Sequence, residues 1–340
     1  MNTQNERRVL SELRDLSVTY HSRMGPVSAV DHVSFDIYQG EIIGLVGESG
    51  CGKSTLGKAM MRMIAPPGEV HGHHYFEGED VMAYADKQLR DFRGRCISMI
   101  FQDPMTSLNP VQRVDEHLIE AIQVHEPKTR KEAALDRAKI LIERLGIQQR
   151  RLNSYPHQLS GGMRQRVMIG LGLVLNAALI VADEATTSLD VIVEAKLVDQ
   201  MKDIRDEFGV SILLITHNIA LVAQIADRLA VMYAGRVVEL GTVYEVFDDP
   251  KHPYTRGLLS SVPTIKLDKR EELFKMPGEP PNLTHPPSGC RFHPRCPEAM
   301  PVCSQVQPDL KPIEGSERLV HCWLYHDPAG KMARQSEVTA

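Results

Sequence analysis

The chain has 340 residues, which exceeds one minimal domain and suits one large domain with an added segment. An apolar content of 42%, a charged content of 24% and a formal net charge of −5 are typical of an ordinary folded protein. This balance argues against a disordered chain and against a protein that coats polyanions, so we expect no nucleic-acid partner.

Neither the N-terminus nor the most apolar window has the pattern of a membrane segment. Residues 1–13 contain no apolar run after their charges, so they do not resemble a secretory signal. The window Val167–Ala182 is interrupted by Asn176 and falls short of the roughly 20 residues that a spanning helix needs. We therefore expect a cytoplasmic chain, and any membrane crossing would belong to other chains.

The first predicted elements are strands. Residues 13–37 alternate apolar and polar positions, which predicts antiparallel strands. Glu41–Val46 is a short apolar run typical of a buried strand, and it leads into a glycine-rich turn and a helix that begins near Lys53.

The middle of the chain alternates helices and strands. Apolar residues at helical spacing predict a helix over residues 129–145. Leu179–Ala182 and Val210–Thr216 are two further buried strands, separated by a helix with Leu197, Met201, Ile204 and Phe208 on one face. This alternation predicts a doubly wound α/β core.

The amino-acid composition changes after His252, where the chain is rich in proline and turn residues and has no long periodic segment. We expect this region to be irregular and unable to build a large core by itself. The polar residues from Pro328 onward are expected to fray.

A phosphate-loop pattern is the strongest local signal. The pattern G-x-x-x-x-G-K-[ST] lies between a predicted strand and a predicted helix, where a turn that binds nothing is a poor explanation. Backbone N–H groups of such a loop point at phosphates, a lysine reaches the β and γ phosphates, and a hydroxyl coordinates Mg²⁺. The predicted ATP contacts are Gly47, Glu48, Ser49, Gly50, Cys51, Gly52, Lys53, Ser54 and Thr55.

Two adjacent carboxylates, Asp183 and Glu184, end one of the buried strands. Carboxylates there are costly to bury without a cation or hydrogen-bond donors. Asp183 suits an acid that holds Mg²⁺ indirectly, and Glu184 suits a base that polarises the water attacking the γ-phosphate. A pair of helix-capping acids is the alternative, which the phosphate loop disfavours.

A segment shortly before these carboxylates resembles a known family. Leu159-Ser-Gly-Gly-Met163 is similar to the LSGGQ signature of ATP-binding-cassette (ABC) ATPases. Met163 departs from the final glutamine, which leaves the backbone anion site of Ser160, Gly161 and Gly162 unaffected. Gln102 resembles the family's Q-loop glutamine, Ser188–Asp190 its D-loop, His217 its switch histidine and Tyr20 the aromatic residue that stacks on adenine.

The resemblance implies a fold and a division of the chain. The fold would be of the α/β class, an ABC-type P-loop NTPase core with an antiparallel β subdomain and a helical subdomain. This core would cover residues 8–250, with the helical subdomain at about 103–165. Residues 251–327 would form a small irregular extension and residues 328–340 a disordered tail.

The resemblance also implies an ATPase mechanism. Glu184, His217 and Gln102 would be catalytic, and Ser54, Gln102 and Asp183 would hold Mg²⁺. The signature of one cassette would close over the phosphate loop of another, so one cassette per chain implies a dimer. His217 would contact the γ-phosphate and the attacking water.

Three further segments, 102–110, 155–160 and 252–255, resemble the peptide and nickel importer branch of the family. That branch implies a second related ATPase subunit, two transmembrane permeases and an extracytoplasmic substrate-binding protein, with this chain peripheral at the cytoplasmic face. We expect di- or oligopeptide import, with nickel, glutathione or oligosaccharide as alternative cargo. A soluble ABC regulator lacks support because the chain has neither two cassettes nor a long coiled coil, and an inactive scaffold conflicts with the intact Glu184 and His217.

Four cysteines gather near the C-terminus in the spacing C-x5-C-x6-C-x18-C, while Cys51 in the phosphate loop suits a small packing residue rather than a redox switch. In a segment without a large core, they suggest a metal centre as a staple. No pair has the close spacing of structural zinc, so a [4Fe–4S] cluster, which the resemblance also suggests, is favoured over zinc and over unliganded thiols. The predicted ligands are Cys290, Cys296, Cys303 and Cys322, and His293 and His321 keep a mixed zinc site open.

Overall fold

The computed structural model describes residues 7–101, 108–184, 201–261 and 276–327. These residues form two compact units that interleave along the sequence. The first unit comprises Met1–Leu10, Ile37–Ile42 and Asp80–Thr216, and the second comprises Ser11–Asp36, Ile43–Glu79 and His217–Ala340. Each unit is described by itself below.

Parallel strands form the sheet of the first unit. β7 (Leu179–Asp183) lies between β6 (Ile97–Ile100) and β8 (Ser211–Ile215) and runs parallel to both. Every residue of β7 and β8 is buried, as expected for parallel strands covered on both faces. Before this sheet the chain forms η1 (Val81–Ala83) and α2 (Asp86–Arg95).

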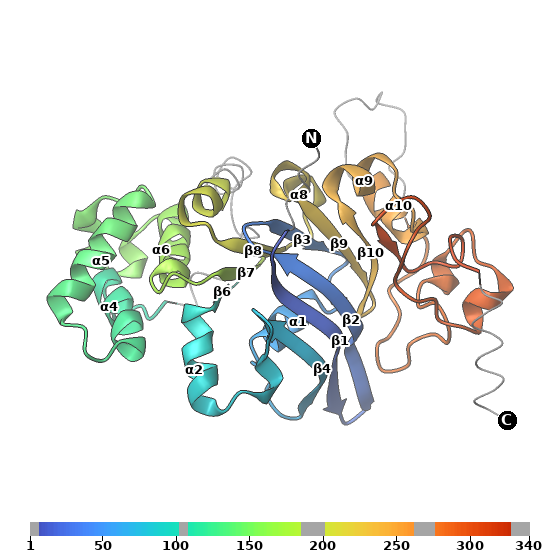
Figure 1. Ribbon diagram of the computed structural model, residues 1–340, viewed down its shortest axis with the longest axis horizontal. Coiled ribbons are helices and arrows are strands. Elements are labelled where there is room, and N and C mark those ends of the chain that lie inside the picture. The colour runs from blue at the N-terminus through green and yellow to red at the C-terminus, as the bar shows by residue number, and fades with distance from the viewer. Residues whose placement is uncertain (1–6, 102–107, 185–200, 262–275, 328–340) are drawn as a thin grey trace. The chain divides into compact units, whose positions relative to one another are not determined.

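Three helices of the first unit pack side by side, as Figure 1 shows: α4 (Val114–His125), α5 (Lys131–Arg144) and α6 (Gly161–Leu173). Short 3-10 turns η2 (Gln149–Asn153) and η3 (Pro156–Gln158) connect α5 to α6. The helical spacing of apolar residues explains the packing, because Leu118, Ile122, Ala138 and Ile142 are fully buried.

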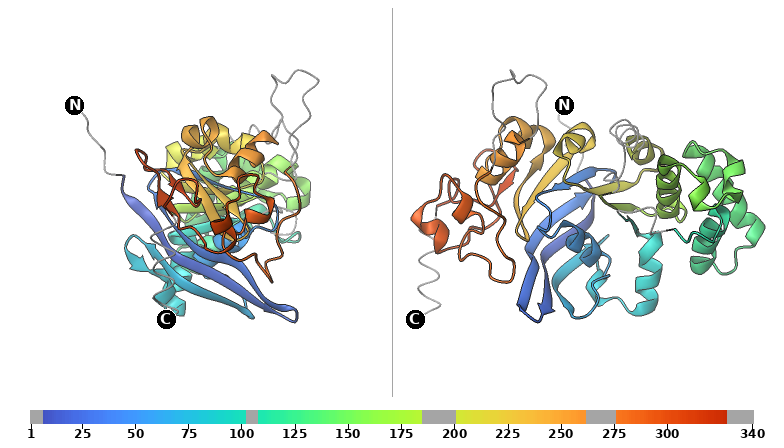
Figure 2. Two further views of the ribbon diagram at one scale, coloured as in Figure 1. Left: turned by 90° about the vertical axis from the view of Figure 1, so that its right-hand side faces the viewer. Right: turned by 180° about the vertical axis from the view of Figure 1, so that it is seen from behind.

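The antiparallel sheet has the strand order β2-β1-β4-β5. Figure 1 labels β2, β1 and β4, and Figure 2 shows the long strands β1 and β2 (blue) from two further sides. Its strands are β1 (Val9–Ser22), β2 (Gly25–Tyr38), β4 (Gly68–Phe76) and β5 (Glu79–Asp80), and β1 runs antiparallel to β4. The buried His74 lies in hydrogen-bond contact with Ser11 Oγ at 2.8 Å and with the Met60 carbonyl at 2.9 Å. A polar side chain in this core is therefore satisfied on both ring nitrogens.

A further set of paired strands in the second unit includes the phosphate-loop strand. β3 (Ile42–Val46) pairs in parallel with β9 (Arg228–Tyr233), which pairs antiparallel with β10 (Arg236–Thr242). α1 (Lys53–Met60) follows β3, and α8 (Ile219–Ile225) packs so closely that a Cβ at Gly44 would lie 2.3 Å from Val222. Glycine is thus required where the helix meets the strand.

The C-terminal segment contains short elements: α9 (Val243–Asp248), α10 (Pro253–Ser260), η4 (His293–Arg295), η5 (Pro301–Ser304), β11 (Lys311–Pro312) and β12 (Leu319–Val320). β12 pairs antiparallel with β10 and β11 pairs with β12. Phe292 is buried against Tyr233 and Tyr254, with ring centroids 5.1 and 5.5 Å away. The segment is short of regular structure, as expected, but it extends the sheet of β9 and β10 and joins its core.

The α/β class with a parallel core sheet, an antiparallel sheet and a helical group is confirmed. Residues 201–208 are helical as predicted, whereas Leu197 of that helix and the tail 328–340 lie outside the described residues. Among the helices that the structure describes, none has the length and apolar character needed to cross a membrane.

Candidate functional site

The phosphate-loop pattern lies between β3 and α1. Lys53 is the first residue of the helix, and its side chain returns over the loop and is 4% exposed. The ammonium donates to the carbonyls of Gly47 and Glu48 at 2.8 and 2.9 Å. The loop carbonyls therefore hold this charge inside the curve of the loop, next to the N-terminus of α1.

Two glycines are required for the loop to fit its surroundings. A Cβ at Gly47 would lie 2.1 Å from the Met232 carbonyl, and one at Gly52 would lie 2.1 Å from the Ala29 carbonyl. Gly52 also has a φ of +105°, which side chains rarely adopt. These close contacts explain why the pattern has glycine at both positions.

The loop has further contacts that the pattern does not predict. The Glu48 N–H donates to the Tyr254 hydroxyl at 2.9 Å, and the Gly235 N–H donates to the Cys51 carbonyl at 2.8 Å. The Glu48 carboxylate accepts two hydrogen bonds from Arg295, at 2.9 and 3.1 Å. Tyr254 lies in the segment 252–255, and Arg295 lies between Cys290 and Cys296. Neither sequence pattern predicts a contact with this loop.

Cys51 is buried in the same loop. Burial raises the pKa of its thiol, although the Lys53 ammonium opposes the rise. A thiol with a raised pKa is mostly protonated at neutral pH, which suits a small packing residue.

Tyr20 and His217 belong to the second unit together with the phosphate loop. Tyr20 is half-buried on β1 opposite Gly68, where a Cβ would lie 2.9 Å from the tyrosine ring. His217 is exposed and immediately precedes Asn218, whose side chain caps α8 by accepting the Leu221 N–H.

The two predicted carboxylates lie at the end of β7 in the first unit. Asp183 is 6% exposed and is the last residue of the strand. Glu184 has a φ of +47°, and its N–H donates to the Ile215 carbonyl at 2.8 Å. A non-glycine residue in this backbone region is strained by about 1 kcal/mol or more, and such residues cluster at functional sites.

The signature segment also lies in the first unit, at the start of α6. Ser160 is the N-cap, and its Oγ accepts the Met163 N–H at 3.4 Å. Gly161 and Gly162 form the first turn, so their side-chain-free backbone borders the positive end of a helix of 13 residues. Met163 contributes its N–H to this cap, so the unusual side chain does not alter that contact.

Gln102 and the segment Ser188–Asp190, which resembles the D-loop, lie outside the described residues. The described candidate residues divide between the units. Asp183, Glu184 and the signature belong to the first, and the phosphate loop, Tyr20 and His217 belong to the second.

The four C-terminal cysteines lie within range of one another's charge. Burial, with a smaller contribution from the neighbouring thiols of the group, raises the pKa of Cys290 to about 11 and that of Cys322 to about 12. Each sulfur accepts at least one backbone N–H, including that of Met300 to Cys303 at 3.4 Å. Among the described residues, however, no three His, Cys, Asp or Glu side chains are arranged to hold a metal ion.

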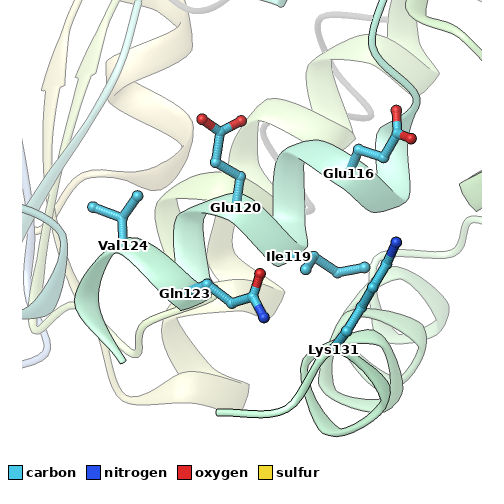
Figure 3. A pocket seen from close by; sticks show the side chains of 6 residues that line it. All are labelled: Glu116, Ile119, Glu120, Gln123, Val124 and Lys131. Carbon is cyan, nitrogen blue, oxygen red and sulfur yellow. The ribbon is translucent and has the colours of Figure 1, made fainter. Parts of the chain in front are cut away.

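A shallow pocket of about 360 Å³ lies apart from the predicted residues, on α4 and the start of α5. Figure 3 shows its six lining side chains, Glu116, Ile119, Glu120, Gln123, Val124 and Lys131. None of them is a predicted site residue.

Solved structures share this fold. The dimeric ABC transporter cassette MJ0796 aligns with a TM-score of 0.61 and 26% identity, over 69% of this chain and 99% of that chain. CbiO1 of Clostridium perfringens, part of the CbiONQ transporter complex, aligns with the same TM-score and identity, over 71% of this chain and 92% of that chain. Fold and loop together define a nucleotide-binding cassette of the ABC type.

Matches to family models and to curated relatives identify the branch of the ABC family. The ABC transporter model matches residues 30–187, and the model of the oligopeptide/dipeptide transporter C-terminal region matches residues 238–303. The oligopeptide transport ATP-binding protein OppD of Bacillus subtilis is 44% identical, over 97% of this chain and 93% of that protein. The dipeptide transport protein DppD of B. subtilis is 44% identical, over 93% and 95%. The chain therefore belongs to the ABC transporter family, among the ATP-binding subunits of oligopeptide and dipeptide transporters.

Proposed function

We infer that this chain hydrolyses ATP to drive the import of di- or oligopeptides. The observation that carries this inference is a glycine-shaped phosphate loop with a buried Lys53, in a chain that matches peptide-transport subunits over nearly their whole length. The chain is an ABC-type ATPase, and the substrates of the hydrolysis reaction are ATP and water.

Each candidate residue has a role that its chemistry supports. Lys53 would bind the β and γ phosphates, and Tyr20 would stack on the adenine ring. Ser54, Asp183 and Gln102 supply oxygen ligands of the kind that Mg²⁺ prefers, and the ion would neutralise phosphate charge when bound. Glu184 would take a proton from the attacking water, and His217 would contact the γ-phosphate.

The signature supports a dimeric mechanism. Ser160, Gly161 and Gly162 present backbone N–H groups at the positive end of α6, which suits the γ-phosphate held by a second cassette. We propose a related ATPase as that second subunit, two permeases as membrane partners and an extracytoplasmic binding protein as the peptide donor. The chain would then lie peripherally at the cytoplasmic face of the membrane.

The variant Ser160→Arg tests the dimeric mechanism. A bulky cation at the start of α6 should prevent cassette closure while the separate phosphate loop still binds nucleotide. We expect ATP binding to be retained and steady-state hydrolysis by the assembled transporter to fall by about tenfold or more. The measurements are nucleotide titration and phosphate release, with peptide-stimulated hydrolysis of the unaltered transporter as reference. Normal turnover by Ser160→Arg would contradict closure across the two chains.

We further propose that Cys290, Cys296, Cys303 and Cys322 ligate a [4Fe–4S] cluster, with zinc as the alternative. Support comes from four thiols within one short segment and from the backbone N–H donors at each sulfur, which favour thiolates. A bound cation would stabilise the thiolates and so lower the pKa values that burial raises.

Metal and sulfide analysis of anaerobically purified protein separates the alternatives. A cluster predicts about four irons and four acid-labile sulfides per chain, with absorbance at about 400 nm, and Cys322→Ser should lower all three. Equimolar zinc without iron would contradict the cluster.

We also propose that the chain divides into an ATP-binding domain and a C-terminal extension. Residues 8–250 would form the ATP-binding domain, with the helical part at about 103–165, and residues 251–327 the peptide-transporter extension. The two separate family-model matches, at 30–187 and 238–303, support a division of the chain into two parts.

A further inference from the structure

The C-terminal segment reaches the phosphate loop through one arginine. Arg295, at the end of η4, donates from Nη1 to Glu48 Oε2 at 2.9 Å and from Nη2 to Oε1 at 3.1 Å. Two parallel hydrogen bonds between a guanidinium and a carboxylate fix direction as well as distance. The pair joins residues 247 positions apart in the sequence.

Arg295 is itself held firmly. Its Nε donates to the Pro277 carbonyl at 2.9 Å, Nη1 lies 3.3 Å from the Tyr233 hydroxyl, and the guanidinium carbon lies 5.7 Å from the Tyr233 ring centre. The Arg295 side chain is 7% exposed and that of Glu48 is 23% exposed. The ion pair is therefore mostly shielded from water, where losing one partner leaves the other charge uncompensated.

Glu48 links this contact to the residue that would bind phosphate. Its side chain is held by Arg295, its N–H by the Tyr254 hydroxyl, and its carbonyl accepts from the Lys53 ammonium at 2.9 Å. Nothing in the pattern G-x-x-x-x-G-K-[ST] requires an acid at this position. A carboxylate beside a site for a polyanion is unfavourable by itself, and Arg295 neutralises it.

We propose that Arg295 is a positioning residue for the nucleotide site: through Glu48 it fixes the phosphate loop and cancels the acid's charge, so the C-terminal extension sets the ATP affinity of its own chain. The inference rests on the proposed function of the loop and adds a regulator of that site. In this proposal Arg295 acts through Glu48 and not on the nucleotide itself.

A merely structural arginine of the extension would behave differently, and the chain offers one. Arg318 is 3% exposed, and it donates from Nη2 to the Asp249 carbonyl at 2.8 Å and from Nη1 to the Glu245 carbonyl. Its Nε also lies 3.8 Å from the buried Glu239 carboxylate of β10. These contacts anchor the same extension to α9, its end and β10, and none of them is made to the phosphate loop. Arg318→Gln is therefore a matched control for the loss of a buried arginine.

The experiment is a double-mutant cycle on the full chain in its assembled complex. The variants are Arg295→Gln, Glu48→Gln and the double variant, with Arg295→Lys as the conservative change. A fluorescent ATP analogue with Mg²⁺ measures affinity, steady-state hydrolysis separates KM from kcat, and thermal unfolding reports stability.

We expect Arg295→Gln to weaken nucleotide affinity and raise KM by about tenfold, with a smaller change in kcat. Arg295→Lys should restore affinity in part, because it keeps the charge but not the paired donors. Glu48→Gln removes the acid's charge together with the pair, so the double variant should bind no more weakly than Arg295→Gln. Arg318→Gln should lower thermal stability and leave affinity unchanged.

Three outcomes would overturn the inference. These are wild-type affinity in folded Arg295→Gln, additive effects in the double variant, or an equal loss of affinity in Arg318→Gln. If Arg295→Gln does not fold, the cycle is repeated with Arg295→Lys in its place. Unchanged nucleotide affinity in Glu48→Gln, together with additive effects of Glu48→Gln and Arg295→Lys, would then contradict the inference. Failure of the wild-type protein to bind Mg-ATP would instead reject the proposed function.

Discussion

ATP hydrolysis by the assembled transporter is expected to fall at least a hundredfold when Glu184 is replaced by glutamine, while Mg-ATP binding is retained. The amide has nearly the same shape but cannot accept a proton from water, and a positioned base contributes about 10²- to 10⁴-fold. The backbone of Glu184, at a φ of +47° with its N–H on the Ile215 carbonyl, involves no side-chain atom and should be preserved.

Phosphate release measures this effect, and nucleotide titration shows that the site is still filled. Glu207→Gln is a matched control, because Glu207 is a half-exposed carboxylate that pairs with Arg144 at 3.5 Å. Its loss should change the rate little, since exposed ion pairs contribute about 1 kcal/mol or less. Equal hydrolysis by Glu184→Gln and the wild type would refute the assignment of the base.

Replacement of Lys53 by alanine is expected to weaken Mg-ATP affinity about a hundredfold. The change removes a buried ammonium that the loop holds within its curve. The hydrogen bonds that this ammonium would give to the β and γ phosphates are charge-assisted and worth about 1.5 to 3 kcal/mol each. Hydrolysis should fall with it, because the nucleotide would neither bind nor align.

Titration with a fluorescent ATP analogue measures the loss, and thermal unfolding checks that the chain remains folded. Lys58→Ala is the matched control, because Lys58 lies in the last turn of the same helix and outside the loop. It should bind nucleotide normally. If Lys53→Ala bound as tightly as Lys58→Ala, the loop would not be the phosphate site.

Much of the fold and site could be predicted from the sequence because the signals are local. A glycine's tolerance of positive φ, the burial of an apolar strand and the cap of a helix depend on neighbours a few residues away. This is why the phosphate loop was placed correctly between β3 and α1, and why β7 and β8 were expected within a residue of their observed bounds.

The C-terminal segment was predicted less well. Its proline and turn residues indicated irregular structure, yet β12 extends the sheet beside β10, and Phe292 enters the core at Tyr233. Irregular backbone can bury side chains where another element supplies the surface, and no periodic pattern records that pairing.

The sequence by itself determined the local patterns from which we propose a triphosphate site: the glycines and Lys53 of one loop, the acids that end β7, and the cap of α6. Only the tertiary structure decided that Tyr254 and Arg295 hold Glu48, across 206 and 247 residues of chain. Hydrogen bonds and ion pairs act over a few ångströms, so contacts between distant segments become evident only once the chain has folded.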